Sequence, residues 1–233
     1  MIKVDYCNLK FKNGFELNVK NIVFKQGEQV HIIGESGSGK SVFIKAILNL
    51  IKSKSEIYKI EKEEKIFNTD IRFRNNIAYL SQNNLIWEHL SVEEHINFVL
   101  SNGKTLKYQK ETDEFLEIFN LQNRKKEKAK NLSFGERQRL SCAVVLASKP
   151  KYLFLDEPFS NLDVVNINKI SSILKEFYKK YNFCVINITH NYIGIDNSDR
   201  VIVFENGKIV FDGLYKDMDS SRSEWIKEWR GLI

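Results

Sequence analysis

The chain has 233 residues, a formal net charge of +6 and three cysteines. That length allows one large domain or two modest ones with a real core, but no stretch reaches the roughly 20 apolar residues of a membrane-spanning helix. The scattered cysteines match neither a disulfide framework nor a metal site, and residues 1–5 lack an apolar secretion signal, so we expect a protein of the reducing cytosol with buried, inert cysteines.

Residues 1–24 are expected to form an antiparallel sheet. Short apolar segments alternate with polar turns at Asn13-Gly14 and Lys20-Asn21, and the predicted strands are Ile2–Val4, Leu9–Phe11, Phe15–Val19 and Ile22–Phe24. Phe11 and Phe15 are of the residue type that stacks on an adenine ring. By default, however, an aromatic residue on a strand belongs to the core.

A phosphate-binding loop follows the next predicted strand, residues 29–33. Residues 34–41 match the pattern G-x-x-x-x-G-K-[ST] at every fixed position, and the apolar spacing after them predicts a helix. In such a loop the backbone N–H groups and the helix N-terminus point at one anion. Lys40 is expected to reach the β- and γ-phosphates and Ser41 to ligate Mg²⁺. The candidate phosphate contacts are Gly34, Glu35, Ser36, Gly37, Ser38, Gly39, Lys40, Ser41 and Val42.

A helical segment is predicted in the middle of the chain. Strands are expected at Ile57–Ile60 and Asn76–Leu80, the second ending at Ser81-Gln82, after which residues 90 to about 123 have helical apolar spacing. A lysine-rich loop then leads to Ser133, which has the spacing of a helix N-cap with Glu136 three residues on. We interpret this block as a helical subdomain inserted into an α/β protein.

Two adjacent carboxylates follow the apolar strand Tyr152–Leu155. A fully apolar run of this kind is typical of a strand buried in a parallel sheet, and ligands bind at the carboxyl ends of such strands. Asp156 and Glu157 therefore need a cation, a proton or solvent. With a phosphate loop in the same chain, Mg²⁺ is the natural partner of Asp156, and Glu157 is expected to face the attacking water.

The last third of the chain is predicted to add a helix, a strand and a hairpin. The helix spans Val164–Tyr181, the strand Phe183–Ile188 ends at Thr189-His190, and the hairpin turns at Asn206-Gly207. A histidine at such a strand end is often only a satisfied polar residue. The tail, with Trp225, Ile226 and Trp229 on one side of a short helix, is expected to pack back on the body.

These elements together resemble the nucleotide-binding subunits of ATP-binding cassette (ABC) transporters. The matching motifs, in order, are Walker A (34–41), the Q-loop Gln82, the signature (132–136), Walker B with the catalytic glutamate (153–157), the D-loop (160–163) and the switch residue His190. The resemblance implies a P-loop ATPase with a mostly parallel core sheet, an N-terminal antiparallel subdomain and an inserted helical subdomain. The implied division assigns 1–89 and 150–233 to the core and sheets, and about 90–149 to the helical subdomain.

The resemblance also implies a mechanism in which two identical cassettes close head to tail on ATP. Ser133, Gly135 and Glu136 of one copy, with Asp163, would then contact the ATP held by the other. Glu157 would polarise water, His190 would contact the γ-phosphate, and Gln82 would join Mg²⁺ and water to the transporter contact. Phe11 lies at the family's adenine-stacking position, with Phe15 as its competitor. Phe134 and Glu136 depart from the usual signature LSGGQ, whereas Gly135 retains its second glycine.

The implied partners are ATP, a second copy of the chain and polytopic permease subunits. The permease would contact residues 82–90, with Trp87 as an anchor, and would place the protein on the cytoplasmic face of the cell membrane. The basic charge also raises nucleic acid as a partner. Because the lysines alternate with glutamates, we expect no direct nucleic-acid binding. The alternatives are a soluble ABC-type ATPase acting on nucleic acid or ribosomes, and a non-hydrolysing regulatory cassette.

Overall fold

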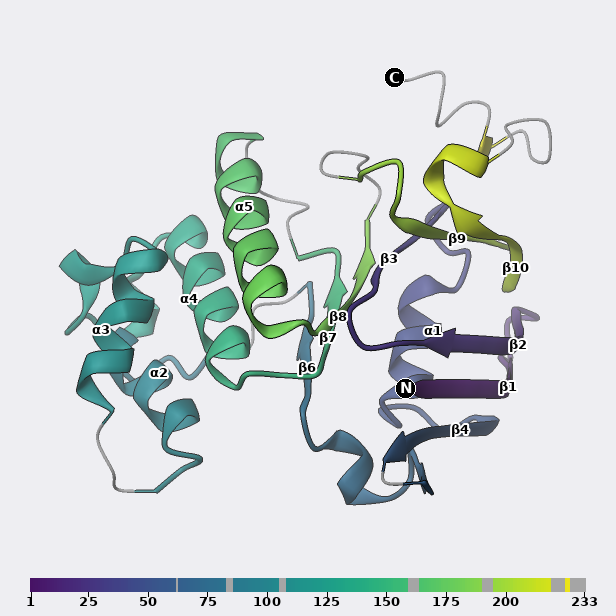
Figure 1. Ribbon diagram of the computed structural model, residues 1–233, viewed down its shortest axis with the longest axis horizontal. Coiled ribbons are helices and arrows are strands. Elements are labelled where there is room, and N and C mark those ends of the chain that lie inside the picture. Colours follow the sequence, from purple (N-terminus) through teal and green to yellow (C-terminus); the bar gives the residue numbers. More distant parts are fainter. Residues whose placement is uncertain are drawn as a thin grey trace. The chain divides into compact units, whose positions relative to one another are not determined.

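The structure is a computed structural model that describes residues 1–61, 63–82, 86–104, 108–158, 164–189, 195–218 and 225–226 (Figure 1). The chain divides into two units, one made of Met1–Ile77 with Cys184–Ile233 and the other of Ala78–Phe183. The predicted helical block, residues 90–149, lies inside the second unit. Within the described ranges, no helix is both long and apolar enough to cross a bilayer.

The first unit begins with a four-stranded antiparallel sheet. Its strand order is β2-β1-β4-β5, and the strands are β1 (Ile2–Lys10), β2 (Glu16–Phe24), β4 (Lys54–Glu61) and β5 (Glu64–Phe67). The predicted antiparallel character is confirmed, but the four short segments expected before Phe24 are two long strands. Asn21 adopts a left-handed φ of 58° and the pairing of β2 with β1 continues on both sides of it. The predicted turn at Lys20-Asn21 is therefore wrong, because asparagine tolerates this conformation at little cost.

The same unit contains the strands that carry the phosphate loop. β3 (Gln29–Gly34) pairs in parallel with both β8 (Cys184–Ile188) and β9 (Arg200–Glu205), and β10 (Lys208–Leu214) pairs antiparallel to β9. The loop after β3 leads directly into α1 (Lys40–Ile47). Short 3₁₀ helices cover Ile71–Arg74 and Tyr215–Asp217. The α/β class with a mostly parallel sheet is as expected.

The C-terminal tail packs on the strand that precedes the phosphate loop. Ile33, Val201 and Val203 form a buried cluster with Met218 and Ile226, and Trp225 lies against this cluster. The predicted return of the tail to the body is confirmed for Trp225 and Ile226, whereas Trp229 lies outside the described residues. Since Ile33 immediately precedes Gly34, the tail contributes to the support of the loop.

The second unit is mainly helical. Its helices are α2 (Val92–Leu100), α3 (Gln109–Ile118), α4 (Phe134–Ala147) and α5 (Val164–Tyr181), with 3₁₀ turns at Gln122–Arg124 and Ala129–Asn131. Capping boxes start two of the helices, Ser91 with Glu94 at α2 and Ser133 with Glu136 at α4. In each, the serine side chain and the third helical residue satisfy backbone donors that the first turn leaves free. The unit also holds β7 (Tyr152–Asp156), which is buried along its whole length, next to β6 (Ile77–Leu80).

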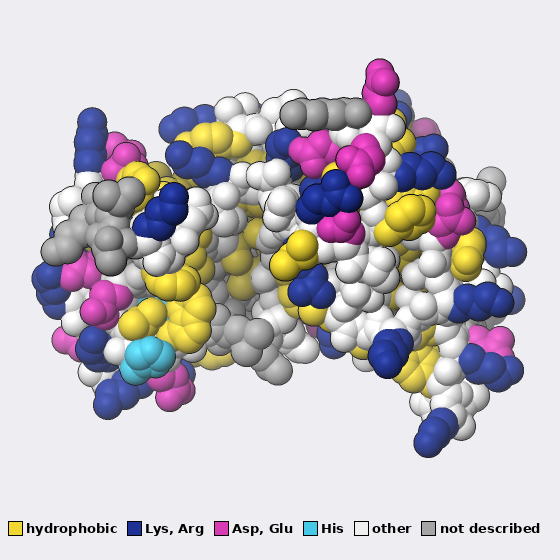
Figure 2. Space-filling model, turned by 90° about the horizontal axis from the view of Figure 1, so that it is seen from below, with side chains coloured by type: hydrophobic (Ala, Val, Ile, Leu, Met, Phe, Trp, Pro, Cys, Tyr) yellow, Lys and Arg dark blue, Asp and Glu magenta, His cyan; other side chains and the backbone are white. Residues whose placement is uncertain are grey.

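Surface charges of both signs are interspersed, as the sequence predicts. Basic and acidic side chains alternate over the face drawn in Figure 2, and many are paired, as in Lys10–Glu16, Arg72–Asp70 and Lys126–Glu93. Exposed pairs of this kind contribute little to stability. They do neutralise local fields, which agrees with a solvated surface.

Cys7, Cys142 and Cys184 are free and buried, as predicted. Burial raises the pKa of Cys7 to about 11 and that of Cys142 to about 12, and it also raises the pKa of Cys184. Because the thiolate is the nucleophile, we expect iodoacetamide at pH 7.5 to leave the folded protein unmodified and to add three groups after denaturation. Mass spectrometry of both samples measures this, and a singly modified native protein would contradict it.

Candidate functional site

The phosphate loop sits between β3 and α1 in the first unit. Gly39, directly before α1, has a φ of +105°, and a Cβ added there would lie 2.9 Å from Phe15 Cζ. The backbone conformation and the neighbouring ring therefore both require glycine at this position. Glu35, Ser36 and Gly37 are exposed, Ser38 and Lys40 are buried, and Ser41 and Val42 are half-buried. The tip of the loop is therefore exposed to solvent, whereas its ends are buried or half-buried.

Lys40 is the buried cation of this loop. Its side chain is nearly enclosed, at 4% exposure. The ammonium nitrogen donates hydrogen bonds to the carbonyl oxygens of Gly34 at 2.8 Å and Glu35 at 2.7 Å, and lies 3.4 Å from Ser38 Oγ. These three partners are neutral groups, and they fix the position of the ammonium within the loop. The lysine is thereby oriented within the loop to meet an anion.

The turn between β9 and β10 braces the loop. The Gly207 N–H donates to the Ser38 carbonyl oxygen at 2.9 Å, and the Gly207 carbonyl accepts from the Asn18 N–H of β2 at 2.8 Å. A Cβ at Gly207 would lie only 1.9 Å from the Glu16 carbonyl oxygen, and its φ is +75°. The backbone of β2 therefore approaches the turn so closely that only glycine fits at position 207, and the turn is hydrogen-bonded to the loop through Ser38.

Two aromatic rings lie in the β1–β2 connection. Phe11 is 37% exposed, and its ring centroid is 5.8 Å from that of Phe15 at a tilt of 52°. Phe15 is half-buried, and its ring reaches Gly39 of the loop. Phe11 therefore offers the freer face, while Phe15 makes the contact with the loop. The exposed ring of Phe11 and the proximity of Phe15 to the loop are each a property expected of the adenine-stacking residue.

The two predicted carboxylates stand at the end of β7 in the second unit. Asp156 is 5% exposed, and Tyr79 on β6 donates its hydroxyl proton to Asp156 Oδ2 at 3.0 Å. Burial, followed by the Asp156 charge, raises the pKa of Tyr79 well above its usual value, so the phenol keeps its proton. Glu157 is half-buried and has a left-handed φ of 50°. Such strained backbone recurs at active sites.

The N-terminus of α4 is built by the predicted capping box. Ser133 Oγ accepts from the Glu136 N–H, and Glu136 accepts in return from the Ser133 N–H at 2.8 Å and from Arg124 Nε at 2.9 Å. These bonds, first the one from the Ser133 N–H, lower the pKa of Glu136. Phe134 is 49% exposed, and a Cβ at Gly135 would come no closer than 3.8 Å to Arg139. The helix therefore presents an open backbone and an exposed ring.

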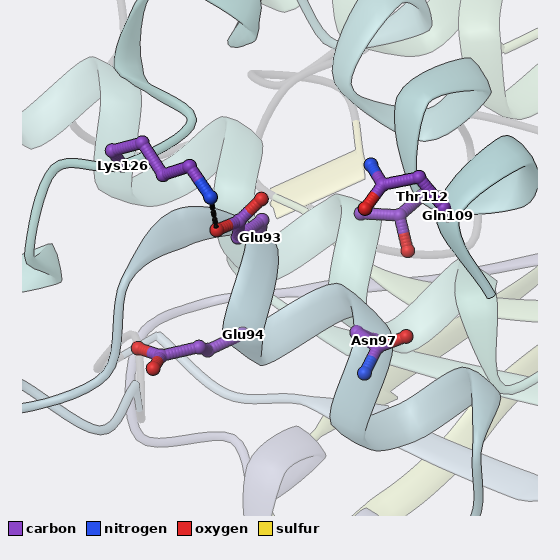
Figure 3. Close-up of a pocket in the computed structure, with 6 residues that line it drawn as sticks. All are labelled: Glu93, Glu94, Asn97, Gln109, Thr112 and Lys126. Carbon is purple, nitrogen blue, oxygen red and sulfur yellow. Dashed lines mark hydrogen bonds and ion pairs between the residues drawn. The ribbon is translucent and has the colours of Figure 1, made fainter. Parts of the chain in front are cut away.

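A separate pocket of about 230 Å³ lies between α2 and α3 (Figure 3). Each of its carboxylates is paired with a lysine, Glu93 with Lys126 and Glu94 with Lys128. The Thr112 hydroxyl at its wall is buried and has no hydrogen-bond partner among the residues that the structure describes. Because its charges are already paired, this pocket does not resemble a phosphate site. Its lining consists of Glu93, Glu94, Asn97, Gln109, Thr112 and Lys126.

Comparison with known proteins decides what this arrangement is. The profile of the ABC transporter family matches residues 17–160, which include the phosphate loop, the α4 N-terminus and both carboxylates. The chain belongs to the ABC transporter family. It is an ATP-binding, ATP-hydrolysing subunit of that family, and its mostly parallel sheet with an antiparallel subdomain is the fold of ABC ATPase cassettes.

Two relatives and one solved structure illustrate the similarity. A probable sulfate/thiosulfate import ATP-binding protein, CysA of Chlorella vulgaris, is 29% identical over 99% of each chain. The energy-coupling factor transporter ATP-binding protein EcfA1 of Streptococcus agalactiae is 34% identical over 87% of this chain and 75% of its own. The dimeric post-hydrolysis state of an ATP-binding cassette with ADP and Pi has a TM-score of 0.76 and 25% identity, covering 94% of this chain and 100% of that one.

The structure of the ABC ATPase groups the predicted site residues by unit. Phe11 and the loop residues lie in the first unit, and Gln82, Ser133, Gly135, Glu136, Asp156 and Glu157 in the second. Gln82 is exposed just beyond β6. The D-loop residues 160–163, Asp163 among them, and His190 lie outside the described residues. Their roles stay predictions.

Sequence reasoning missed residues that act through partners far along the chain. Gly207 was assigned only to a hairpin turn, and Tyr79 only to a strand. Gln138, buried in α4, donates its side-chain amide to the Pro158 carbonyl oxygen, which ties this helix to the segment just after Glu157. The sequence shows only that Gly207 is a glycine at a turn and that Tyr79 is a tyrosine on a strand. Neither pattern identifies the distant residue to which each is hydrogen-bonded.

Proposed function

We propose that this ATPase powers the import of a solute across a membrane. The observation that carries the proposal is the full-length match to CysA, a protein named for sulfate/thiosulfate import, which aligns over 99% of both chains. In this proposal, the membrane subunits with which the cassette assembles bind the transported solute. This chain lies at the cytoplasmic face of the membrane and converts ATP binding and hydrolysis into motion.

The proposed nucleotide site is centred on the phosphate loop. The side chain of Lys40 is already buried. Its ammonium would give up its hydrogen bonds to the carbonyl oxygens and bind the β- and γ-phosphate oxygens instead. The adenine ring would stack on Phe11, the more exposed of the two rings, with Phe15 as the alternative. Mg²⁺, when bound, would neutralise charge on the β- and γ-phosphates. Its proposed ligands are Ser41, Gln82 and Asp156, and Tyr79 keeps the Asp156 carboxylate oriented by its hydrogen bond.

The proposed active form is a head-to-tail pair of identical chains. The similar cassette bound to ADP and Pi is a dimer, which supports this assembly. The exposed N-terminus of α4, with Ser133 and Gly135, would cover the γ-phosphate held by the other copy, since a helix N-terminus favours an anion. Glu136 and Asp163 are proposed to lie in the same interface. Phe134 would add an apolar surface where the family usually has glycine.

Glu157→Gln is expected to lower the rate of ATP hydrolysis about 100-fold, because a neutral amide cannot accept a proton from the attacking water. ATP binding should remain, so the variant should accumulate as an ATP-bound dimer visible by light scattering. Glu176→Gln, the same change on an exposed part of α5, serves as the control and should hydrolyse normally. A Glu157→Gln protein with full turnover would contradict the assigned role of Glu157.

The proposed function is tested by purification of the protein from membranes of its own host in mild detergent. A polytopic membrane protein should accompany it in stoichiometric amount, with a contact near residues 82–90. Uptake of labelled solute by vesicles containing the complex should depend on ATP on the cytoplasmic side. Recovery of ribosomes or nucleic acid in place of a membrane protein would overturn the transport proposal and leave the ATPase assignment intact.

A further inference from the structure

The imidazole of His95 is fully buried beneath the segment that follows the Q-loop. His95 lies on α2 with 0% exposure. Its Nδ1 is 2.7 Å from the Ser91 carbonyl oxygen, and its Nε2 is 3.0 Å from the Trp87 backbone nitrogen. Both ring nitrogens are therefore engaged, one on the preceding turn and one on a segment eight residues earlier.

The chemistry of the two partners fixes the protonation state of this ring. A carbonyl oxygen can only accept a hydrogen bond, so Nδ1 must carry a proton. A backbone N–H can only donate, so Nε2 must present a lone pair. The geometry is therefore compatible only with neutral His95 in the Nδ1–H tautomer. The doubly protonated ring would set two donors, Nε2–H and the Trp87 N–H, against each other.

His95 lies against the ring of Trp87, which in turn contacts Phe98, and both of these aromatic residues are exposed. The Trp87 ring is 45% exposed, and its centroid lies 5.6 Å from that of His95 and 5.3 Å from that of Phe98. Phe98, one turn further along α2, is 47% exposed. Figure 2 shows hydrophobic side chains gathered on the part of the molecule that carries α2. The placement of Trp87 at this surface thus depends on a bond to the ring below it.

We propose that His95 is a positioning residue whose neutral form holds Trp87 in this surface, and that protonation of His95 releases the Trp87 segment. The surface would then be presented at neutral pH and lost on acidification. Its consequence for a membrane partner rests on the proposed function. The release itself is a property of this unit alone.

The charged surroundings of the ring support the direction of this switch. Burial is the main effect and lowers the pKa of His95; the Ser91 carbonyl and the Glu94 charge oppose it, and the nearby His89 adds to it. Glu94 is itself engaged with the Ser91 N–H and with Lys128. Since the unfolded chain binds the proton more readily, the local structure is favoured above about pH 6.5 and weakens as pH falls below that value.

Nuclear magnetic resonance on protein labelled with ¹⁵N-histidine and ¹⁵N-tryptophan tests the proposal. At pH 7.5 the His95 ring should show the Nδ1–H tautomer, and the Trp87 amide, assigned with Trp87→Phe, should be protected from hydrogen exchange. Titration below pH 6.5 should charge His95 and abolish the protection of the Trp87 amide together, with at least a tenfold faster exchange after correction for the intrinsic effect of pH.

Two variants separate the switch from general acid unfolding. His95→Gln, which cannot become charged, should remove the pH-dependent change at Trp87, and His89→Gln should retain it. An Nε2–H tautomer at pH 7.5, or a Trp87 amide that stays protected while His95 titrates, would overturn the proposal. These readouts involve neither ATP nor a membrane partner, so their failure is distinct from failure of the transport proposal.

Discussion

Replacement of Lys40 by methionine is expected to lower the rate of ATP hydrolysis by about 1,000-fold, the loss typical when one preorganised charge contact to a transition state is removed. Methionine retains most of the apolar stem, so the side-chain volume changes little. What disappears is the ammonium that now lies 2.8 Å from the Gly34 carbonyl oxygen and 2.7 Å from that of Glu35. Phosphate release measured with saturating MgATP reports the effect.

Lys45→Met provides the matched control for this change. Lys45 lies on the same helix, and its side chain is exposed, so its removal alters the net charge equally without touching the loop. It should hydrolyse ATP at nearly the normal rate. The Lys40 variant also leaves the buried Gly34 carbonyl oxygen and the partly buried Glu35 carbonyl oxygen without this donor, at a cost of about 1–3 kcal/mol in the free energy of unfolding. Equal activity of the two variants would refute the assigned role of Lys40.

Gly207→Ala is expected to lower the free energy of unfolding by about 3–4 kcal/mol and to weaken ATP binding at the same time. Part of the loss comes from the left-handed φ of +75°, and the larger part from a Cβ that would lie 1.9 Å from the Glu16 carbonyl oxygen. The backbone must move, and the bonds from Gly207 to Ser38 and Asn18 move with it. Urea unfolding and titration with a fluorescent ATP analogue measure the two effects.

Gly14→Ala separates the effect of backbone strain from the effect of a steric clash. Gly14 also has a left-handed φ, +87°, but a Cβ there would meet nothing within 4 Å. Its substitution should cost only about 1 kcal/mol, for the backbone conformation alone, and should leave ATP affinity unchanged. If both glycine variants lost the same stability and both bound ATP normally, the proposed brace between Gly207 and the phosphate loop would be wrong.

The features that the sequence predicted well depend on residues close together in the chain. The strand, loop and helix around residues 34–41, and the capping box from Ser133 to Glu136, are each determined by contacts within a few residues. α5 covers Val164–Tyr181, as its helical pattern predicts. Local elements of this kind follow from the spacing of residue types, so a single sequence is enough to predict where they lie.

The features that escaped prediction are made by contacts between distant segments. The bonds of Gly207 to Ser38 and Asn18 and of Tyr79 to Asp156 join residues that no spacing rule connects. Asn21 misled the prediction in the opposite way, because a residue typical of turns sits within a continuous strand. The two hydrogen bonds of His95 combine a local partner, Ser91, with an unforeseen one, Trp87.

The burial of all three native thiols has a practical consequence for watching this ATPase work. A cysteine introduced at an exposed position, such as Glu111 on α3, would be the reactive thiol in an otherwise wild-type chain. A spin label attached there would report the distance between the two copies of the proposed head-to-tail pair. Closure and opening of this proposed pair could then be timed without first engineering a cysteine-free background.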